Sequence, residues 1–198
     1  MKIIAISQRV DEIKDYGEIR DALDENWQKL FLQLDAAVLP IPNESRILQA
    51  ALERIRPDAI VLSGGNHPQV YGGTAPERDR IDEGLIQYAI KNGIPLLGVC
   101  RGMQSIAMYF GGSLKKTTGH VAVWHEIEGG ITREVNSYHS YAVDDPGDGI
   151  TVVSRTKDGV AEAICHEEYP VYGIMWHPER VKGFDEADLL FIKEKLRL

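Results

Sequence analysis

Through the first half of the chain, short apolar runs alternate with longer segments in which apolar residues recur every three or four positions. The short runs have the length and composition of buried strands, whereas the recurrence in the longer segments is that of one face of a helix. Strands are predicted at residues 3–7, 36–39, 59–62 and 96–99, and helices at residues 25–34, 46–54, 77–92 and 101–110. This alternation predicts a parallel sheet covered by helices on both faces.

The pattern changes at about His120. The runs that follow alternate apolar with polar residues and are separated by Gly, Pro and Asp turns, which is typical of antiparallel strands. These runs are HVAVWHEI, GITREVNSYHSYAV, ITVVSRT, VAEAICH and VYGIMW, and a last amphipathic helix is expected at residues 186–197. We therefore predict one α/β domain over residues 1–198, a doubly wound, mostly parallel sheet with a mixed or antiparallel extension in the C-terminal half.

Composition narrows the choice of partners and compartment. The 198 residues include 22 Lys and Arg against 30 Asp and Glu, a formal charge of -8 that repels phosphate backbones and anionic membranes. We expect neither nucleic acid nor a membrane as a partner. The apolar part of MKIIAISQRV is too short for a signal peptide, so a cytoplasmic protein is expected. In that compartment Cys100 and Cys165 are interpreted as separate thiols.

Cys100 lies in the stretch LLGVCRGMQ, at the predicted junction of a strand and a helix. Ligands of open α/β sheets bind at this edge, and G-x-C-x-G has the form of a nucleophile elbow with sulfur in place of oxygen. The sharp turn needs Gly98 and Gly102 for its close chain crossings. The amides of the following helix would stabilise a thiolate. The alternative is a buried cysteine that only fills a corner.

A thiol nucleophile needs a base, and the sequence VYGIMWHPER offers one. Proline favours an extended residue before it, and residues two apart in an extended chain project to the same side. Glu179 is therefore expected to reach one ring nitrogen of His177 while the other faces Cys100, as in a catalytic triad. The alternative is a polar surface turn after a strand.

Three motifs together resemble the class I glutamine amidotransferase family. They are GVCRGMQ at residues 98–104, MWHPER at residues 175–180 and LSGGNHP at residues 62–68. Arg101, the ERD at residues 77–79 and the VNSYHS at residues 135–140 are similar to its γ-glutamyl hydrolase branch. The resemblance implies a flavodoxin-like amidotransferase fold and no cofactor. It also implies a small-molecule γ-glutamyl substrate.

The resemblance implies that Cys100 attacks the γ-glutamyl amide, that His177 protonates the departing amine, and that water hydrolyses the resulting glutamyl thioester. The oxyanion would be bound by the backbone amides of Arg101 and Gly65. Substrate binding by similarity falls to Gly64, Gln104, Asn136, Ser137 and Tyr138.

Arg101 and four further histidines lie outside the predicted triad. Arg101 is expected to be solvated, as most arginines in a first helical turn are, with Asp79 or a substrate carboxylate as alternative partners. Four histidines outside the triad are interpreted as structural: His120, His125, His139 and His166. In particular, His120 and His125 share a strand-like run without a third ligand, so no metal site is predicted.

Three classes of function fit these residues. The first is a free-standing hydrolase of a γ-glutamyl amide, and the second is a glutaminase subunit that delivers ammonia to a separate synthetase. The third, a non-catalytic binding relative, fits poorly with retention of the whole triad. The leaving group stays open: a polyamine would need an acidic outer pocket, and a nucleotide amidate would need basic and aromatic groups. A homodimer is the expected form for an oligomer.

Overall fold

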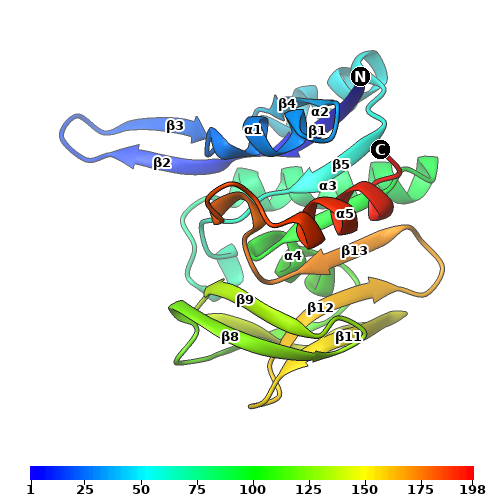
Figure 1. Ribbon diagram of the computed structural model, residues 1–198. Coiled ribbons are helices and arrows are strands. Elements are labelled where there is room, and N and C mark those ends of the chain that lie inside the picture. The colour runs from blue at the N-terminus through cyan, green and yellow to red at the C-terminus, as the bar shows by residue number, and fades with distance from the viewer.

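The computed structural model describes all 198 residues and is built around a nine-stranded mixed sheet (Figure 1). Its strand order is β4-β1-β5-β6-β13-β12-β11-β8-β9, and the first five strands are parallel. These five are β4 (Ala36–Ile41), β1 (Lys2–Ser7), β5 (Ala59–Leu62), β6 (Leu96–Val99) and β13 (Val171–Ile174). The four N-terminal strands confirm the predicted parallel core. The fifth comes from the end of the chain, so the last strand lies beside β6.

The remaining four strands of the sheet run antiparallel to one another, as the second half of the sequence predicts. They are β12 (Ala161–His166), β11 (Ile150–Thr156), β8 (Val121–Gly129) and β9 (Arg133–Tyr138). The expected run of residues 130–143 is divided at His139 and Ser140. Its second part, β10 (Tyr141–Asp145), leaves the sheet and pairs with β7 (Ser113–Lys116).

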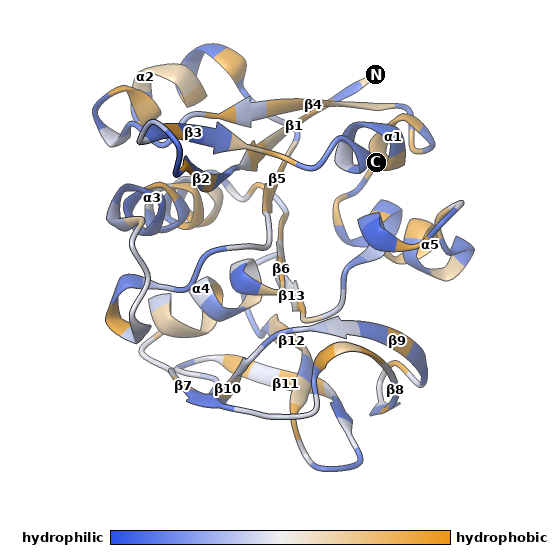
Figure 2. Ribbon diagram, turned by 90° about the vertical axis from the view of Figure 1, so that its left-hand side faces the viewer, coloured by the Kyte–Doolittle hydropathy of each residue, from blue (hydrophilic) through white to orange (hydrophobic).

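Helices cover both faces of the sheet (Figure 2). On one face lie α2 (Ser45–Ile55), α3 (Pro76–Asn92) and α4 (Arg101–Tyr109), and on the other lie α1 (Asn26–Leu32) and α5 (Glu186–Lys195). Two short 3₁₀ turns, η1 (Gln69–Tyr71) and η2 (Pro178–Arg180), follow strand ends. The apolar faces of these helices and the sheet form one core cluster of 40 buried residues. None of the helices has the length and apolarity that a membrane crossing requires.

A hairpin of β2 (Arg9–Ile13) and β3 (Glu18–Ala22) extends from the body of the molecule, and the sequence pattern does not predict it (Figure 1). Its residues are mostly exposed and include charged side chains on both faces. Without a buried face, the alternation of apolar and polar residues that reveals a strand is missing. The short strand β7 is not predicted either, because only one of its four residues, Leu114, is buried.

Candidate active site

Cys100 occupies the sharp turn between β6 and α4, where it is the N-cap residue of the helix. Its backbone has φ 52° and ψ -103°, a conformation that residues other than glycine rarely adopt. Its amide donates to the carbonyl of Ile174 over 2.7 Å, which fastens the turn to β13. Strained backbone of this kind is held only where the surrounding structure fixes it, and it is common at functional sites.

The two glycines around Cys100 are required by close packing. A Cβ atom on Gly98 would lie 2.5 Å from the backbone of Gly102. A Cβ atom on Gly102 would lie 2.2 Å from the carbonyl oxygen of Leu62. The start of α4 therefore passes directly against β5 and β6, as the elbow interpretation of G-x-C-x-G expects.

His177 and Glu179 follow the end of β13, the strand next to β6. Glu179 Oε1 lies 2.6 Å from His177 Nδ1, and both side chains are buried. The contact expected from the H-P-E spacing is thus present. Asn136 fixes the backbone of His177 from β9, because its side chain donates to the His177 carbonyl and accepts from the His177 amide, each over 2.8 Å.

The surroundings of His177 favour its protonated form. Burial lowers the pKa of the imidazole, but the negative charges of Cys100 and Glu179 outweigh burial and raise this pKa to about 9. The Cys100 sulfur and the imidazole line the same cavity. A thiol beside an imidazole that a carboxylate orients is an arrangement that can supply a nucleophile and a proton donor.

The loop Gly64–Gly65 follows β5, the strand on the other side of β6. A Cβ atom on Gly64 would lie 2.7 Å from Cε1 of His177, so only glycine leaves room for the imidazole. Gly65 has φ +90° and lines the cavity. The amide of Gly65 donates to no protein acceptor. The amides in the first turn of α4 have no partner within the helix.

Arg78 shapes this loop, and the sequence pattern did not reveal it as a site residue. Its guanidinium is fully buried and donates to the carbonyls of Ser63, Gly64 and Gly65 over 2.6, 3.0 and 2.8 Å. Burial lowers the pKa of Arg78 to about 9, and the charge of Cys100 acts against that change. Arg78 forms no ion pair with a carboxylate, so it supplies positive charge near Cys100. The ERD motif at residues 77–79 could have indicated this role, because Arg78 is its middle residue.

Arg101 is not solvated, which corrects the expectation from the sequence. Its side chain is buried and forms ion pairs with Asp79 and Asp82 of α3. It also donates to Ser105 Oγ over 2.9 Å. The pairing with Asp79 was the alternative considered. The Arg101 side chain therefore joins α4 to α3, while its amide lies in the first turn of α4.

The residues of the three motifs meet in one cavity of about 310 Å³. Of the predicted site residues, Gly65, Cys100, Arg101, Gln104, Tyr138 and His177 line it. Gln104 donates from Nε2 to the carbonyl of Tyr141 over 2.9 Å. The ring of Tyr138 meets His177 edge to face, and the guanidinium of Arg180 lies over the same tyrosine, 4.6 Å from the ring centre.

Three predicted substrate-binding residues lie beside the cavity without lining it. Gly64 packs against the His177 ring. Asn136 is buried and bonded to the backbone of His177, and Ser137 is buried with its hydroxyl donating to the carbonyl of His120. Of β9, only its last residue, Tyr138, lines the cavity. Asn136 and Ser137 therefore support the site from behind.

The structure places a third possible metal ligand beside His120 and His125. Glu162 of β12 lies beside both, and the possible ligand atoms of the three residues are within 4.8 Å of one another. The sequence did not reveal this neighbour, because Glu162 is 37 residues from His125 and comes close to it only through the order of strands in the sheet.

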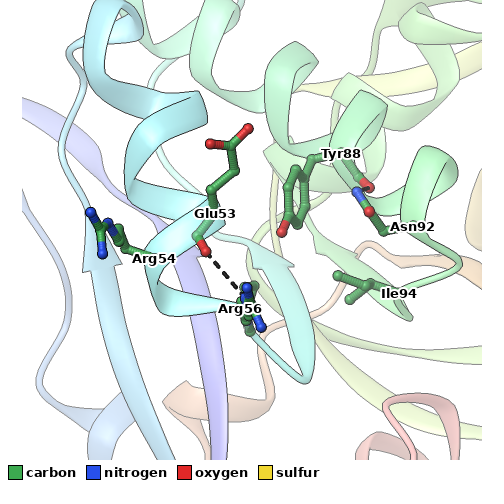
Figure 3. A pocket seen from close by; sticks show the side chains of 7 residues that line it. Glu53, Arg54, Arg56, Tyr88, Asn92 and Ile94 are labelled. Atoms are coloured by element: carbon green, nitrogen blue, oxygen red, sulfur yellow. Dashed lines mark hydrogen bonds between the residues drawn. The ribbon is translucent and has the colours of Figure 1, made fainter.

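A larger hollow of about 660 Å³ lies on the surface near the C-terminal ends of α2 and α3 (Figure 3). Its walls are formed by Glu53, Arg54, Arg56, Pro57, Tyr88, Asn92 and Ile94. Arg56 Nε donates to the carbonyl of Glu53 over 3.4 Å, and Tyr88 donates to the carbonyl of Leu52. Because this hollow contains no cysteine or histidine, we assign the chemistry to the smaller cavity at Cys100.

Comparison with known proteins gives consistent findings. Residues 13–195 match the family model described as glutamine amidotransferase class-I. The chain is 32% identical over 191 residues to γ-glutamyl-CDP-amidate hydrolase of Campylobacter jejuni, with 94% of each chain covered. It is 34% identical over 180 residues to anthranilate synthase component 2 of Saccharolobus solfataricus, covering 81% of this chain and 87% of the relative.

The fold is shared with solved structures. A Thermoplasma acidophilum protein, provisionally assigned as one subunit of GMP synthase, matches with a TM-score of 0.73 at 18% identity. The match covers 98% of this chain and 92% of that one, so the agreement extends over both parts of the sheet.

Proposed function

The chain belongs to the class I glutamine amidotransferase family, whose chemistry is amide hydrolysis, and from this premise we propose that it hydrolyses a γ-glutamyl amide with Cys100 as nucleophile. The observation that carries the proposal is the junction of β5, β6 and β13. Three adjacent parallel strands end there with the Gly64–Gly65 loop, Cys100 and His177.

The reaction follows from this arrangement in two steps. The Cys100 thiolate attacks the δ-carbonyl of the glutamyl group, and the C–N bond then breaks as the His177 imidazolium gives its proton to the departing amine. His177, now neutral, takes a proton from water, and the resulting hydroxide cleaves the C–S bond of the thioester to give glutamate. Glu179 holds the imidazole through Nδ1, so that Nε2 serves both transfers.

The oxyanion of each tetrahedral intermediate is stabilised by the amides of Gly65 and Arg101. The free amide of Gly65 and the partnerless first-turn amide of Arg101 support this assignment. Removal of one such donor commonly costs about 10²-fold to 10³-fold in rate. Arg78 donates to the carbonyl of Gly64, which shares a peptide plane with the Gly65 amide, and thereby orients that amide.

For the leaving group we favour an anionic, nucleotide-type amidate. Arg180, His67 and Tyr138 line the cavity, and no carboxylate does. The guanidinium of Arg101 is already paired with Asp79 and Asp82, so the positive charge available to a substrate is that of Arg180. A cationic polyamine would find no negative partner there, whereas phosphate groups and a base would meet guanidinium and aromatic faces. The similarity to γ-glutamyl-CDP-amidate hydrolase supports the same class of substrate.

The test is to incubate the purified protein with a γ-glutamyl nucleotide amidate, a γ-glutamyl polyamine and glutamine, and to measure released glutamate. We expect the amidate to be hydrolysed fastest. Rapid acid quenching followed by mass spectrometry should find a glutamyl adduct on Cys100. The Cys100→Ala variant should release no glutamate, and Cys165→Ala, which changes the other free thiol, should behave as the parent does. An active Cys100→Ala variant would disprove the proposed nucleophile.

A second candidate is a glutaminase subunit that delivers ammonia to a synthetase. It is supported by the similarity to anthranilate synthase component 2. Both functions need the same residues to bind and attack the glutamyl group. They differ in the leaving group, which is ammonia in the glutaminase and a larger amine or amidate in the hydrolase.

A further inference from the structure

Three histidines converge on one buried carboxylate behind the wall of the Cys100 cavity. Glu162 on β12 is fully buried, and His120 and His125 approach it from the start and the middle of β8. His139, in the turn between β9 and β10, approaches the same carboxylate. None of these groups has a part in the proposed hydrolysis.

The distances fit the first coordination sphere of a small metal ion. Glu162 Oε1 lies 3.4 Å from His125 Nε2 and 3.8 Å from His120 Nδ1. In a tetrahedral zinc site with bonds of about 2.0 Å, neighbouring ligand atoms are about 3.3 Å apart. The His125 contact is already near that separation.

Hydrogen bonds on the far side of the rings fix which nitrogen is free. His120 Nε2 lies 3.0 Å from Asp158 Oδ2, and a carboxylate only accepts, so Nε2 carries a hydrogen and Nδ1 is the nitrogen that faces Glu162. Histidines that bind metals almost always donate their other nitrogen to a carboxylate or carbonyl in this way.

His139 contacts the same carboxylate from the turn after β9. Its Nε2 lies 3.2 Å from Glu162 Oε1, and its Nδ1 lies 3.0 Å from the carbonyl oxygen of Tyr141. A carboxylate that binds a metal is itself held by hydrogen bonds from the surrounding protein. His139 therefore fits the role of a residue that positions Glu162.

Three atoms in this cluster are buried and lack a hydrogen-bond partner: His120 Nδ1, His125 Nε2 and Glu162 Oε2. A buried polar atom without a partner costs about 1–3 kcal/mol, and more for a charged group. Three such atoms on converging side chains point to a missing common partner that is positively charged.

We propose that His120 Nδ1, His125 Nε2 and the Glu162 carboxylate bind a zinc ion, with His139 positioning Glu162. Two imidazoles and one carboxylate are a ligand set that suits Zn²⁺. The ion joins β8 to β12 behind the cavity. Through His139 and the Tyr141 carbonyl, which also accepts from Gln104, it supports the wall that faces the substrate.

The experiment uses the Cys100→Ala variant, so that a thiolate at the catalytic pair cannot bind the metal. Chelator-treated protein is titrated with Zn²⁺ by calorimetry, and Co²⁺ is used as a spectroscopic probe of the ligand geometry. We expect one equivalent of Zn²⁺ with a rise in the melting temperature, and an intense visible absorption typical of four-coordinate Co²⁺.

Substitutions locate the site. His125→Ala and Glu162→Gln should each weaken Zn²⁺ binding by at least about 100-fold, and Asp158→Asn, which changes an exposed supporting residue, by about tenfold. His166→Ala is the matched control, since this histidine packs against Phe110 and Tyr169 and is absent from the cluster. If the folded Cys100→Ala protein binds no Zn²⁺ at micromolar concentration, or if Asp158→Asn and His125→Ala both bind as tightly as His166→Ala, the inference is overturned. A proton shared within the cluster would then be the missing partner.

Discussion

His177 is held between two negative groups, and this sets the pH range in which it can act as an acid. Burial alone would lower its pKa, but Cys100 and Glu179 raise it to about 9. The imidazole therefore keeps its proton at neutral pH and can transfer it to a departing amine. As pH rises through about 9 that proton is lost, so kcat/KM is expected to fall along an alkaline limb near this value.

Substitution of Glu179 tests this electrostatic account. Glu179→Gln keeps the shape of the side chain but removes one of the charges that raise the His177 pKa, so the alkaline limb of kcat/KM should move to lower pH. Turnover at neutral pH should fall as the imidazole loses its orientation. Glu186→Gln, at an exposed position in the first turn of α5, is the control and should leave the pH profile unchanged. A limb that stays in place in Glu179→Gln would contradict the assigned role of this carboxylate.

At the scale of elements, the position of Cys100 depends on how closely α4 passes β5. Gly102 touches the backbone of Leu62, and Gly98 touches Gly102, so strand, elbow and helix form a single packed unit. Arg101 continues this contact by joining α4 to the two aspartates of α3. The nucleophile is therefore placed by backbone contacts that no side-chain movement can relieve.

Gly102→Ala should test that dependence. The added methyl group meets a backbone carbonyl at 2.2 Å and forces α4 away, which should cost about 1–3 kcal/mol of unfolding free energy. A displacement of about 1 Å at Cys100 should lower kcat by about 100-fold. Urea unfolding and steady-state kinetics measure the two effects.

The control is Gly111→Ala, just after α4, where φ is +85° but no atom lies within 4 Å of the new methyl group. This variant should lose stability through backbone strain and keep its kcat. Equal kcat values for the two variants would show that the contact with β5 does not position Cys100.

At the scale of the whole molecule, the cavity combines the proposed glutamyl site, from the parallel half of the sheet, with a wall from β9 and β10. Gly65, Cys100 and His177 come from the parallel half, Tyr138 comes from β9 of the antiparallel half, and Tyr141 comes from β10, which pairs with β7 outside the main sheet. Discrimination between substrates must arise in the second part, because every γ-glutamyl substrate has the same glutamyl group.

We therefore expect the isolated chain to hydrolyse its preferred conjugate with a kcat/KM at least about tenfold above that for glutamine. Each factor of ten needs only about 1.4 kcal/mol of additional transition-state binding to the leaving group. Arg180→Gln should lower kcat/KM for an anionic conjugate and leave that for glutamine unchanged. The subunit function would be supported instead if the isolated chain is inactive toward the conjugates and becomes a rapid glutaminase when a synthetase is added.

Local patterns in the sequence determined the strands of the parallel core, the helices and the elbow at Cys100. They sufficed because each depends on neighbours along the chain: an apolar period, a glycine two residues away, or a carboxylate two residues from His177. The resemblance to known motifs added the loop at Gly64 and Gly65. The exposed hairpin β2–β3 gave no such pattern, since neither of its faces is buried.

Only the tertiary structure decided which distant residues share a site. The insertion of β13 beside β6 brings His177 to Cys100, and the pairing of β8, β11 and β12 brings Glu162 to His120 and His125. The buried pairs of Arg101 and the support that Arg78 gives to the glycine loop likewise depend on how α3 and α4 pack. Whether a side chain is buried and which charge it pairs with depend on the residues packed around it in the folded protein. Those residues come from distant parts of the sequence.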